Sequence, residues 1–243
     1  MKNWQNWLDA IRIEFRDNKD NFLRQPNIAR TTHPRHGGMT TFMSLSDSKY
    51  LNNTKDPAIG NPDIQFSGRW SWTAVQSAFY LQKMEDVFGV TPETLDEMVD
   101  VGAGYGHLCY SFYKSGFKGK YTMIDFPIMG EIQEHFVSST IGKNKNFWPE
   151  RLLPKNLKPQ TDNAMIFGSF SINEMPLADR QIIEPFYKDY KYIMIVHKNN
   201  DAFGVDNKKY FGELRSKLAK THDMKWYSDP LRKNDNYLLG VRK

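Results

Sequence analysis

The stretch MVDVGAGYGHL, residues 98–108, carries the strongest structural signal in the chain. Residues 98–101 have strand character and run directly into Gly102, Gly104 and Gly106, after which a helical pattern begins. Glycines let a chain turn sharply and let a ligand approach the backbone with no Cβ atom in the way. The stretch therefore predicts a strand, a ligand-binding loop and a helix, in that order.

From about residue 91 onward, short apolar runs alternate with helical stretches. MVDVG is followed by HLCYSFYKSG, YTMIDF by IMGEIQEHFVSST, AMIFGSF by PLADRQIIEPFYKDY, and YIMIVH by DNKKYFGELRSKLAK. NFWPERLLP is a short candidate for the third strand, and MKWYSD and NYLLGVRK form a C-terminal pair separated by a polar turn. Such alternation predicts right-handed crossovers. We expect an α/β, Rossmann-like, doubly wound and mostly parallel seven-stranded sheet with an antiparallel C-terminal hairpin.

Residues 1–90 have a different pattern. Apolar residues spaced by three and four predict an amphipathic helix; they are Trp4, Trp7, Leu8, Ile11 and Phe15. A second helical stretch runs from Ser71 to Phe88 and ends at Gly89. The polar segment 31–68 between them predicts a long irregular loop. We therefore expect a helical lid segment at 1–90 and a cofactor-binding domain at 91–243.

Bulk properties narrow the class of protein. The 243 residues are 40% hydrophobic and 25% charged, which is typical of a folded globular chain. No apolar run reaches membrane-spanning length and the N-terminus is charged, so we expect no membrane contact and a cytoplasmic location. The single cysteine, Cys109, excludes an internal disulfide and is expected to be buried. The net charge of +5 is spread along the chain, so no nucleic-acid partner is expected, while a homo-oligomer stays open.

The spacing of the glycines distinguishes between two cofactors. A dinucleotide fingerprint would place its third glycine at position 107, where this chain has His107. The third glycine is instead Gly106, which favours S-adenosyl-L-methionine over a nicotinamide cofactor. Asp125, at the end of YTMIDF, stands where a carboxylate can accept hydrogen bonds from ribose hydroxyls. The alternative is a tight turn with an ordinary surface aspartate.

The segments VDVGAGYGHL, YTMIDFP and GSFSINEM resemble class I S-adenosylmethionine-dependent methyltransferases, and in particular the sugar O-methyltransferase family. The resemblance covers about residues 49–243 and includes DPAIGNP. It implies an S-adenosyl-L-methionine cofactor, a sugar-like small-molecule acceptor and a set of cofactor-binding residues: Asp100, Gly102, Ala103, Gly104, Gly106, Asp125, Phe126, Ser169 and Phe170. Many such enzymes bind adenine with an acid after the third strand. This chain has none there, and Phe147 and Trp148 are candidates for stacking instead.

Methyl transfer to a hydroxyl needs a general base. Glu174 follows AMIFGSF and His197 ends YIMIVH, so both are expected at strand carboxyl ends; His107 is a third candidate. Each has a simpler alternative. Glu174 could cap the next helix, His197 could merely end a strand, and His107 could cap the helix after the glycines or touch the cofactor carboxylate.

Four residues of the N-terminal segment are candidates for binding the acceptor. Arg35 and His36 lie in the polar loop, and Arg69 stands close to Trp72, whose ring could stack on a sugar. If the segment folds over the cofactor as a lid, these groups would meet a polar or anionic acceptor. The alternative is that they are ordinary surface and core residues.

The sequence also bears on a metal site and on two other function classes. The spacing of Glu174, Asp201 and Asp206 specifies no magnesium site, and no obligatory metal is expected. A nucleic-acid methyltransferase acting on amino groups usually carries an Asn/Asp-Pro-Pro-aromatic signature after the fourth strand, where this chain has GSFS at 168–171. A non-catalytic cofactor-binding protein of the same fold is the third hypothesis.

Overall fold

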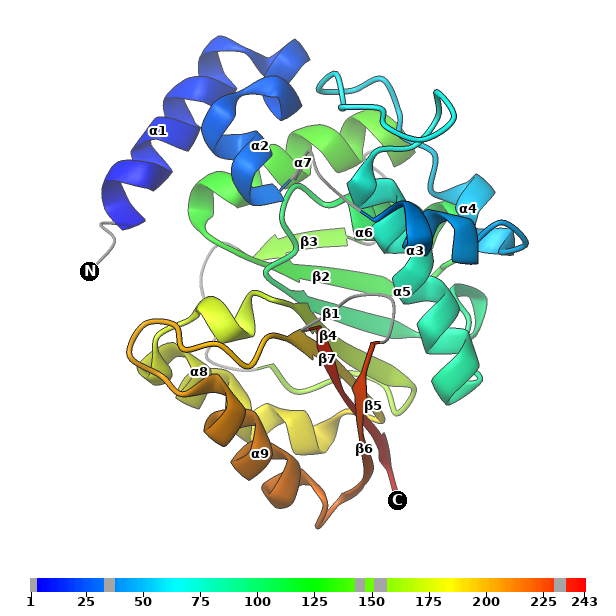
Figure 1. The fold of residues 1–243 in the computed structure, drawn as a ribbon, viewed down its shortest axis with the longest axis vertical. Coiled ribbons are helices and arrows are strands. Elements are labelled where there is room, and N and C mark those ends of the chain that lie inside the picture. The colour runs from blue at the N-terminus through cyan, green and yellow to red at the C-terminus, as the bar shows by residue number, and fades with distance from the viewer. Residues whose placement is uncertain (1–3, 33–37, 143–146, 151–156, 230–234) are drawn as a thin grey trace. The chain divides into compact units, whose positions relative to one another are not determined.

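The computed structural model describes residues 4–32, 38–142, 147–150, 157–229 and 235–243 (Figure 1). The chain falls into two compact units. Unit 1 comprises Met1–Thr94, Gly104–Lys118 and Phe126–Lys145, and unit 2 comprises Leu95–Ala103, Gly119–Asp125 and Asn146–Lys243. The glycine-rich loop therefore begins in unit 2 and continues in unit 1. The division into a lid at 1–90 and a domain at 91–243 stays a prediction.

Unit 2 is built on a sheet whose described strands number seven, in the order β3-β2-β1-β4-β5-β7-β6. The strands are β1 Glu97–Val101, β2 Lys120–Ile124, β3 Phe147–Glu150, β4 Ala164–Ser169, β5 Tyr192–His197, β6 His222–Ser228 and β7 Asn236–Arg242. β3, β2, β1, β4 and β5 pair in parallel, whereas β7 runs antiparallel to both β5 and β6. The predicted mostly parallel sheet and C-terminal hairpin are confirmed, with β7 inserted between β5 and the edge strand β6.

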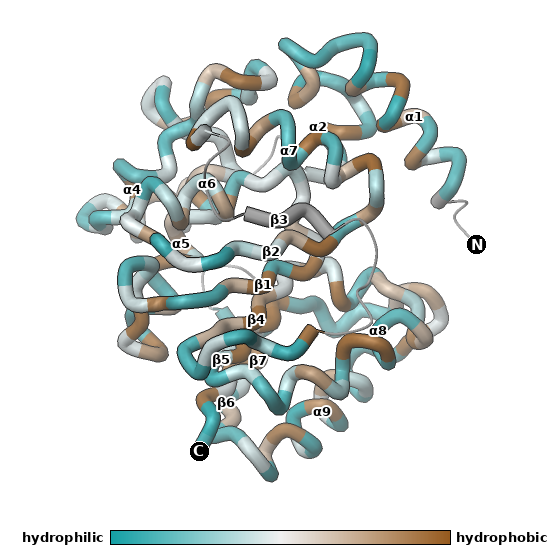
Figure 2. The backbone as a smooth tube through the Cα atoms, turned by 180° about the vertical axis from the view of Figure 1, so that it is seen from behind, coloured by the Kyte–Doolittle hydropathy of each residue, from teal (hydrophilic) through white to brown (hydrophobic). Residues whose placement is uncertain are grey.

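Two helices of unit 2, α8 (Leu177–Ile183) and α9 (Asn207–Leu218), complete its core. Figure 1 shows both lying along one side of the strands. Phe211 and Leu214 of α9 pack in one apolar cluster with Ile166 and Ile193 of the sheet. All residues of β1 and β5 are buried, as expected for central strands. In Figure 2 the central strands β1 and β4 carry brown, hydrophobic segments.

Unit 1 is helical in its described residues. Its elements are α1 Trp4–Asp17, η1 Lys19–Arg24, α2 Pro26–Thr32, α3 Met39–Ser44, α4 Lys49–Asn53, α5 Trp72–Phe88, η2 Pro92–Thr94, α6 His107–Lys114 and α7 Pro127–Ile141. α1 packs against α2 and α7 (Figure 1). Both predicted N-terminal helices are confirmed. The Ser71 hydroxyl accepts a hydrogen bond from the Ala74 amide at the start of α5, and Gly89 ends that helix with a φ of 65°.

The irregular loop predicted for 31–68 is partly wrong, because it contains α3 and α4. Ser48 caps α4 by accepting a hydrogen bond from the Tyr50 amide. Tyr50 and Leu51 are buried, and the Tyr50 hydroxyl donates to Glu85 of α5. Helices of five or six residues owe their stability to such tertiary contacts and leave little periodicity in the sequence. No helix among the described residues is long and apolar enough to cross a membrane.

Candidate active site

Three neighbouring parallel strands of unit 2 end at one edge of the sheet, and each has a residue singled out from the sequence at its end or directly after it. Val101 of β1 pairs with Ile124 of β2 and with the residue of β4 that precedes Ser169. Gly102 and Asp125 follow the first pair directly. Gly102, Asp125 and Ser169 therefore lie together at the carboxyl edge, where open parallel sheets bind their ligands.

Gly102 is required by the protein's own packing. Its φ is +78°, and its amide donates to the Ile124 carbonyl at 2.7 Å. A Cβ atom at this position would lie 2.0 Å from Cβ of Ser171. The Ser171 hydroxyl in turn donates to the Val101 carbonyl. The loop after β4 is thus seated directly on the end of β1, and no larger residue than glycine fits between them.

Gly104 and Gly106 continue the loop within unit 1, with φ of +59° and +94°. The Gly104 carbonyl accepts a hydrogen bond from Gln133 Nε2 of α7 at 2.9 Å. A Cβ atom on Gly104 would approach only the Thr32 side chain among the described residues, at 3.6 and 3.7 Å, which is ordinary contact. Unlike Gly102, Gly104 is not demanded by crowding, and its open backbone fits the close approach of a ligand.

The two acids at this edge have different environments. Asp100 is 2% exposed, and its carboxylate accepts a hydrogen bond from the Tyr121 hydroxyl at 2.9 Å. Burial, and to a lesser extent the nearby charge of Asp125, raise the pKa of Asp100 to about 7, although the hydrogen bond from Tyr121 lowers it. This placement argues against direct ligand contact by Asp100. Asp125 is half-buried and is the accessible acid of the pair.

The backbone after β4 is unusual at Phe170. Its φ is +62°, which is rare for a bulky residue, and its amide donates to the Val196 carbonyl of β5 at 2.8 Å. Lys198 Nζ lies 5.4 Å from the centre of the Phe170 ring. Strained positions of this kind cluster at functional sites.

Phe126, in unit 1 directly before α7, is 41% exposed. Ala103 follows Gly102 and is half-buried.

Glu174 lies in the same loop after β4 and is exposed. It ends the short turn η3 (Ile172–Glu174), and its amide donates to the Ser171 carbonyl at 3.0 Å. Helix α8 begins three residues later with Pro176 at its N-cap and no capping side chain. The capping alternative for Glu174 is therefore wrong, and Glu174 remains a candidate base.

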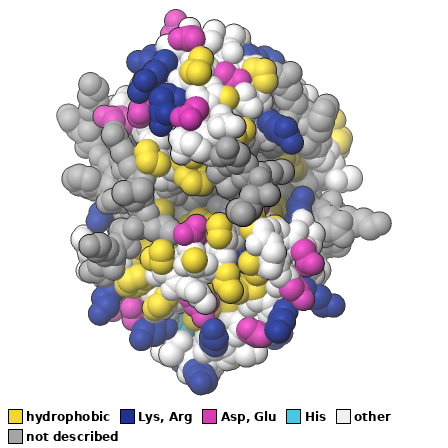
Figure 3. All heavy atoms as spheres, turned by 90° about the vertical axis from the view of Figure 1, so that its left-hand side faces the viewer, with side chains coloured by type: hydrophobic (Ala, Val, Ile, Leu, Met, Phe, Trp, Pro, Cys, Tyr) yellow, Lys and Arg dark blue, Asp and Glu magenta, His cyan; other side chains and the backbone are white. Residues whose placement is uncertain are grey.

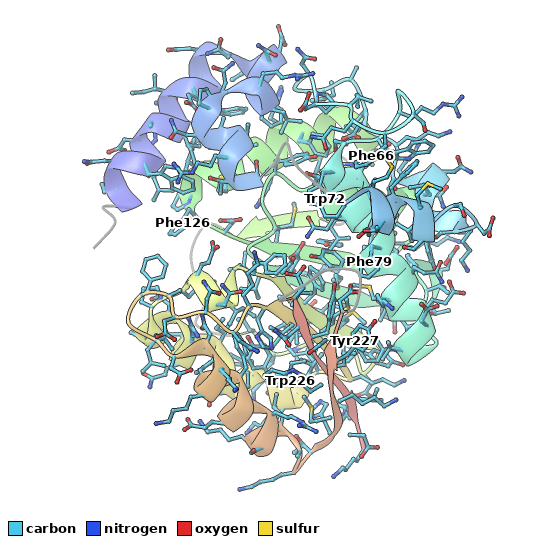
Figure 4. All side chains as sticks on the ribbon, in the orientation of Figure 1. Phe66, Trp72, Phe79, Phe126, Trp226 and Tyr227 are labelled. Carbon is cyan, nitrogen blue, oxygen red and sulfur yellow. The ribbon has the colours of Figure 1, made fainter. Side chains whose placement is uncertain are left out.

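The structure contradicts a catalytic role for His197. The side chain is 0% exposed and its ring stacks on Phe211 of α9, with ring centres 3.9 Å apart. Trp226 of β6, which is labelled in Figure 4, meets the His197 ring edge-on, with ring centres 4.8 Å apart. Burial lowers the pKa of His197 to about 4. Side chains alternate along a strand, and at this position the alternation points the imidazole into the core under α9.

His107 is also unsuited to the predicted roles. It is 2% exposed, and its Nδ1 lies 3.0 Å from the Ser77 hydroxyl and 3.2 Å from the Ser111 hydroxyl. Nε2 lies 3.6 Å from the buried carboxylate of Asp56. Because α6 begins at His107 itself, the N-cap position belongs to Gly106. His107 is a packing and hydrogen-bonding residue inside unit 1.

The predicted acceptor-binding residues are only partly described. Arg69 is exposed and lies in the turn between Phe66 and Trp70, which form an isolated β-bridge. Trp72 is 7% exposed and its ring lies 6.5 Å from that of Phe66, so it offers no open face for a sugar (Figure 4). Arg35 and His36 lie outside the described residues.

The side chains of Phe147 and Trp148, predicted to stack on adenine, also lie outside the described part of the chain. Within that part, no three His, Cys, Asp or Glu side chains form a group that could hold a metal ion. Cys109 is buried, as expected.

The residues that hold the loop after β4 in place could not be predicted from the sequence. Ser171 packs against Gly102, and Arg180 and Asn173 form a buried hydrogen-bonding network behind it. An arginine in the helical run LADRQII looks like a surface residue. The one available signal is that SFSINEM is rich in small polar residues directly after a buried strand.

Comparison with solved structures places this fold among those of methyltransferases. A SAM-dependent methyltransferase from Aquifex aeolicus has 18% identity, with 67% of this chain and 89% of that chain covered and a TM-score of 0.50. The methyltransferase domain of bacterial CtHen1-CN has 11% identity, 68% and 97% coverage and a TM-score of 0.50. An O-methyltransferase family protein from Burkholderia thailandensis has 12% identity and a TM-score of 0.49; 70% of this chain is covered, and the match spans 60% of that protein's length.

At these identities the likeness concerns the fold alone. No family model matches the sequence. No curated protein matches it either.

Proposed function

We propose that this protein is an S-adenosylmethionine-dependent O-methyltransferase that acts on a hydroxyl of a small molecule, a sugar or glycan precursor. The observation that carries the proposal is the joint position of Gly102, Asp125 and Ser169 at the carboxyl ends of three neighbouring parallel strands. The methyltransferase-like fold supports the reaction class. The sugar acceptor rests on the resemblance of VDVGAGYGHL, YTMIDFP and GSFSINEM to sugar O-methyltransferases.

The residues at this edge fit the cofactor chemically. The Asp125 carboxylate is accessible and can accept two hydrogen bonds, which suits the two hydroxyls of a ribose. S-adenosylmethionine supplies an activated methyl group together with its own leaving group. The protein is left to align the acceptor and to remove its proton.

Glu174 is our candidate for removing that proton. Glu174 is exposed in the loop that follows Ser169 and includes Phe170, and it does not cap α8. In this role Glu174 accepts the proton of the acceptor hydroxyl as the oxygen bonds to the transferred methyl carbon. The buried imidazole of His197 cannot reach solvent or ligand.

Exposed apolar residues near the same loops suit an acceptor with a hydrophobic face, such as a sugar ring. Leu177 follows the loop after β4 and is 44% exposed, and Phe203 follows β5 and is 37% exposed. Figure 3 shows hydrophobic side chains gathered in the lower half of the view, among lysines and arginines. Ligand sites commonly combine apolar lining with a few placed polar groups.

The proposal is tested with a methyl-labelled donor and pools of small acceptors, followed by mass spectrometry of the products. Labelled sugar products are expected. Glu174→Gln should lower turnover by about 10²- to 10⁴-fold, the usual contribution of a general base. Glu213→Gln, an exposed acid of α9, is the matched control and should keep full turnover. Equal turnover of both variants would remove Glu174 from the mechanism, and no product from any pool would contradict enzymatic transfer.

A nucleic-acid acceptor is the second candidate, favoured by one surface feature. A groove of about 540 Å³ beside α9 is lined by Lys208 and Arg215 together with Trp226. Cations beside an aromatic ring suit a single-stranded polyanion. RNA oligonucleotides therefore belong among the acceptor pools, and labelled RNA with unlabelled sugars would favour this candidate over the first.

A further inference from the structure

Arg180 of α8 is a charged side chain with no exposed surface. Its guanidinium donates three hydrogen bonds. Nε donates to the Met175 carbonyl at 2.9 Å, Nη2 to the Asn173 carbonyl at 2.9 Å, and Nη1 to the Asn207 side-chain oxygen at 2.7 Å. Two of the three bonds therefore end on the backbone of the loop after β4.

All three hydrogen-bond acceptors of Arg180 among the described residues are neutral. The guanidinium also lies 4.7 Å from the ring centre of Tyr210. Burying a charge is costly, and well-packed apolar residues often replace buried ion pairs without loss of stability. What arginine adds is a rigid fork of donors in one plane. The burial of Arg180 therefore indicates that its directed hydrogen bonds are needed to fix the conformation of the loop after β4.

The same network reaches the loop after β5. Asn207 Nδ2, at the start of α9, donates to the Asn173 carbonyl at 3.2 Å and to the Asn200 carbonyl at 2.6 Å. The Lys198 amide donates to the Asn173 side-chain oxygen at 3.4 Å. Asn173 is thus the point where the two loops that follow β4 and β5 are joined.

We propose that Arg180 is a positioning residue that locks the loop after β4 to the loop after β5. Through this lock it holds Ser171 against Gly102 and keeps Glu174 at the carboxyl edge of the sheet. The consequence for cofactor binding rests on the proposed function. The locking itself does not, because it concerns only contacts within unit 2.

Hydrogen exchange followed by mass spectrometry tests the lock directly. Arg180→Met keeps the volume and removes the donors, so amides in 171–176 and 198–206 are expected to exchange at least tenfold faster. Arg180→Lys keeps the charge with fewer directed donors and should restore part of the protection. Arg30→Met, at an exposed position of α2, is the matched control and should leave both segments unchanged.

A parallel titration with S-adenosylhomocysteine is expected to give at least a tenfold weaker affinity for Arg180→Met. Exchange that stays unchanged in 198–206 overturns the lock, whereas an affinity equal to that of the wild type overturns its consequence for cofactor binding. Should Arg180→Met fail to fold, Asn207→Asp removes the donors to Asn173 and Asn200 while leaving Arg180 in place, and must loosen both segments. A wild-type protein that binds no S-adenosylhomocysteine refutes the proposed function, while the exchange result still decides the lock.

Discussion

Replacing Gly102 with alanine should destabilise the protein severely. The added Cβ would lie 2.0 Å from Ser171 Cβ and 2.6 Å from its hydroxyl oxygen. The backbone at Gly102 is left-handed, with a φ of +78°. The substitution therefore meets two independent penalties, one conformational and one steric.

The magnitudes of both penalties follow from general values. A left-handed backbone costs a non-glycine residue about 1–2 kcal/mol. Overpacking a well-packed site costs about 1–3 kcal/mol. Gly102→Ala should therefore lower the free energy of unfolding by about 2–5 kcal/mol. Gly104→Ala meets only the conformational penalty, about 1–2 kcal/mol, because its nearest neighbour is the Thr32 side chain at 3.6 Å.

Urea denaturation at pH 7 measures the difference between the two variants. The slope with denaturant should stay unchanged, so the midpoint reports stability. The double change Gly102→Ala with Ser171→Gly should be about 1–3 kcal/mol more stable than the sum of the two single changes, because it removes the clashing Cβ. The reasoning fails if Gly104→Ala is as damaging as Gly102→Ala, or if the effects of Gly102→Ala and Ser171→Gly simply add.

Two further predictions concern pH. The pKa of His197 is about 4 in the folded protein, below its usual value of 6.5. Between pH 6.5 and pH 4 the unfolded chain therefore binds more protons than the folded protein, and the wild type loses stability as pH falls. His197→Phe should abolish about 2 kcal/mol of that loss between pH 7 and pH 5, measured as the difference between two urea titrations; parallel pH profiles would contradict the buried, neutral imidazole. Asp100 behaves oppositely, because its raised pKa gives stability that is present below pH 3.8 and lost as pH rises through about 7. Asp100→Asn should therefore be more stable than the wild type above pH 7, by about 4 kcal/mol at most, and an equal melting temperature at pH 8.5 would refute this.

The fold was predictable where helices are long or where strands and helices alternate regularly. The spacing of apolar residues from Trp7 to Phe15 predicts α1, and Ser71 and Gly89 mark the ends of α5. The sheet follows from apolar runs that alternate with helical stretches, and the runs that form β1 and β5 are fully buried. The short helices α3 and α4 were missed because their stability comes from distant partners, such as Glu85 for Tyr50.

The candidate site was predictable only at the level of strand ends. Gly102 and Asp125 come together because parallel strands in register end at the same edge. The prediction for His197 is wrong because side chains alternate along a strand, so a difference of one position decides whether a side chain points into the core or away from it. Phe211, which covers His197 in the core, lies in the next helix. His107 was misassigned because the groups around it, Asp56 and Ser77, are far away in sequence.

The most direct test of the proposed cofactor site is calorimetric titration of the wild type and Asp125→Asn with S-adenosylhomocysteine. We expect one bound molecule per chain in the wild type and an affinity about 10- to 100-fold weaker in the variant, the loss expected for hydrogen bonds to a charged acceptor. NAD should give no binding to either protein. An absence of binding to the wild type, equal affinities for both proteins, or comparable binding of NAD would contradict the proposed site.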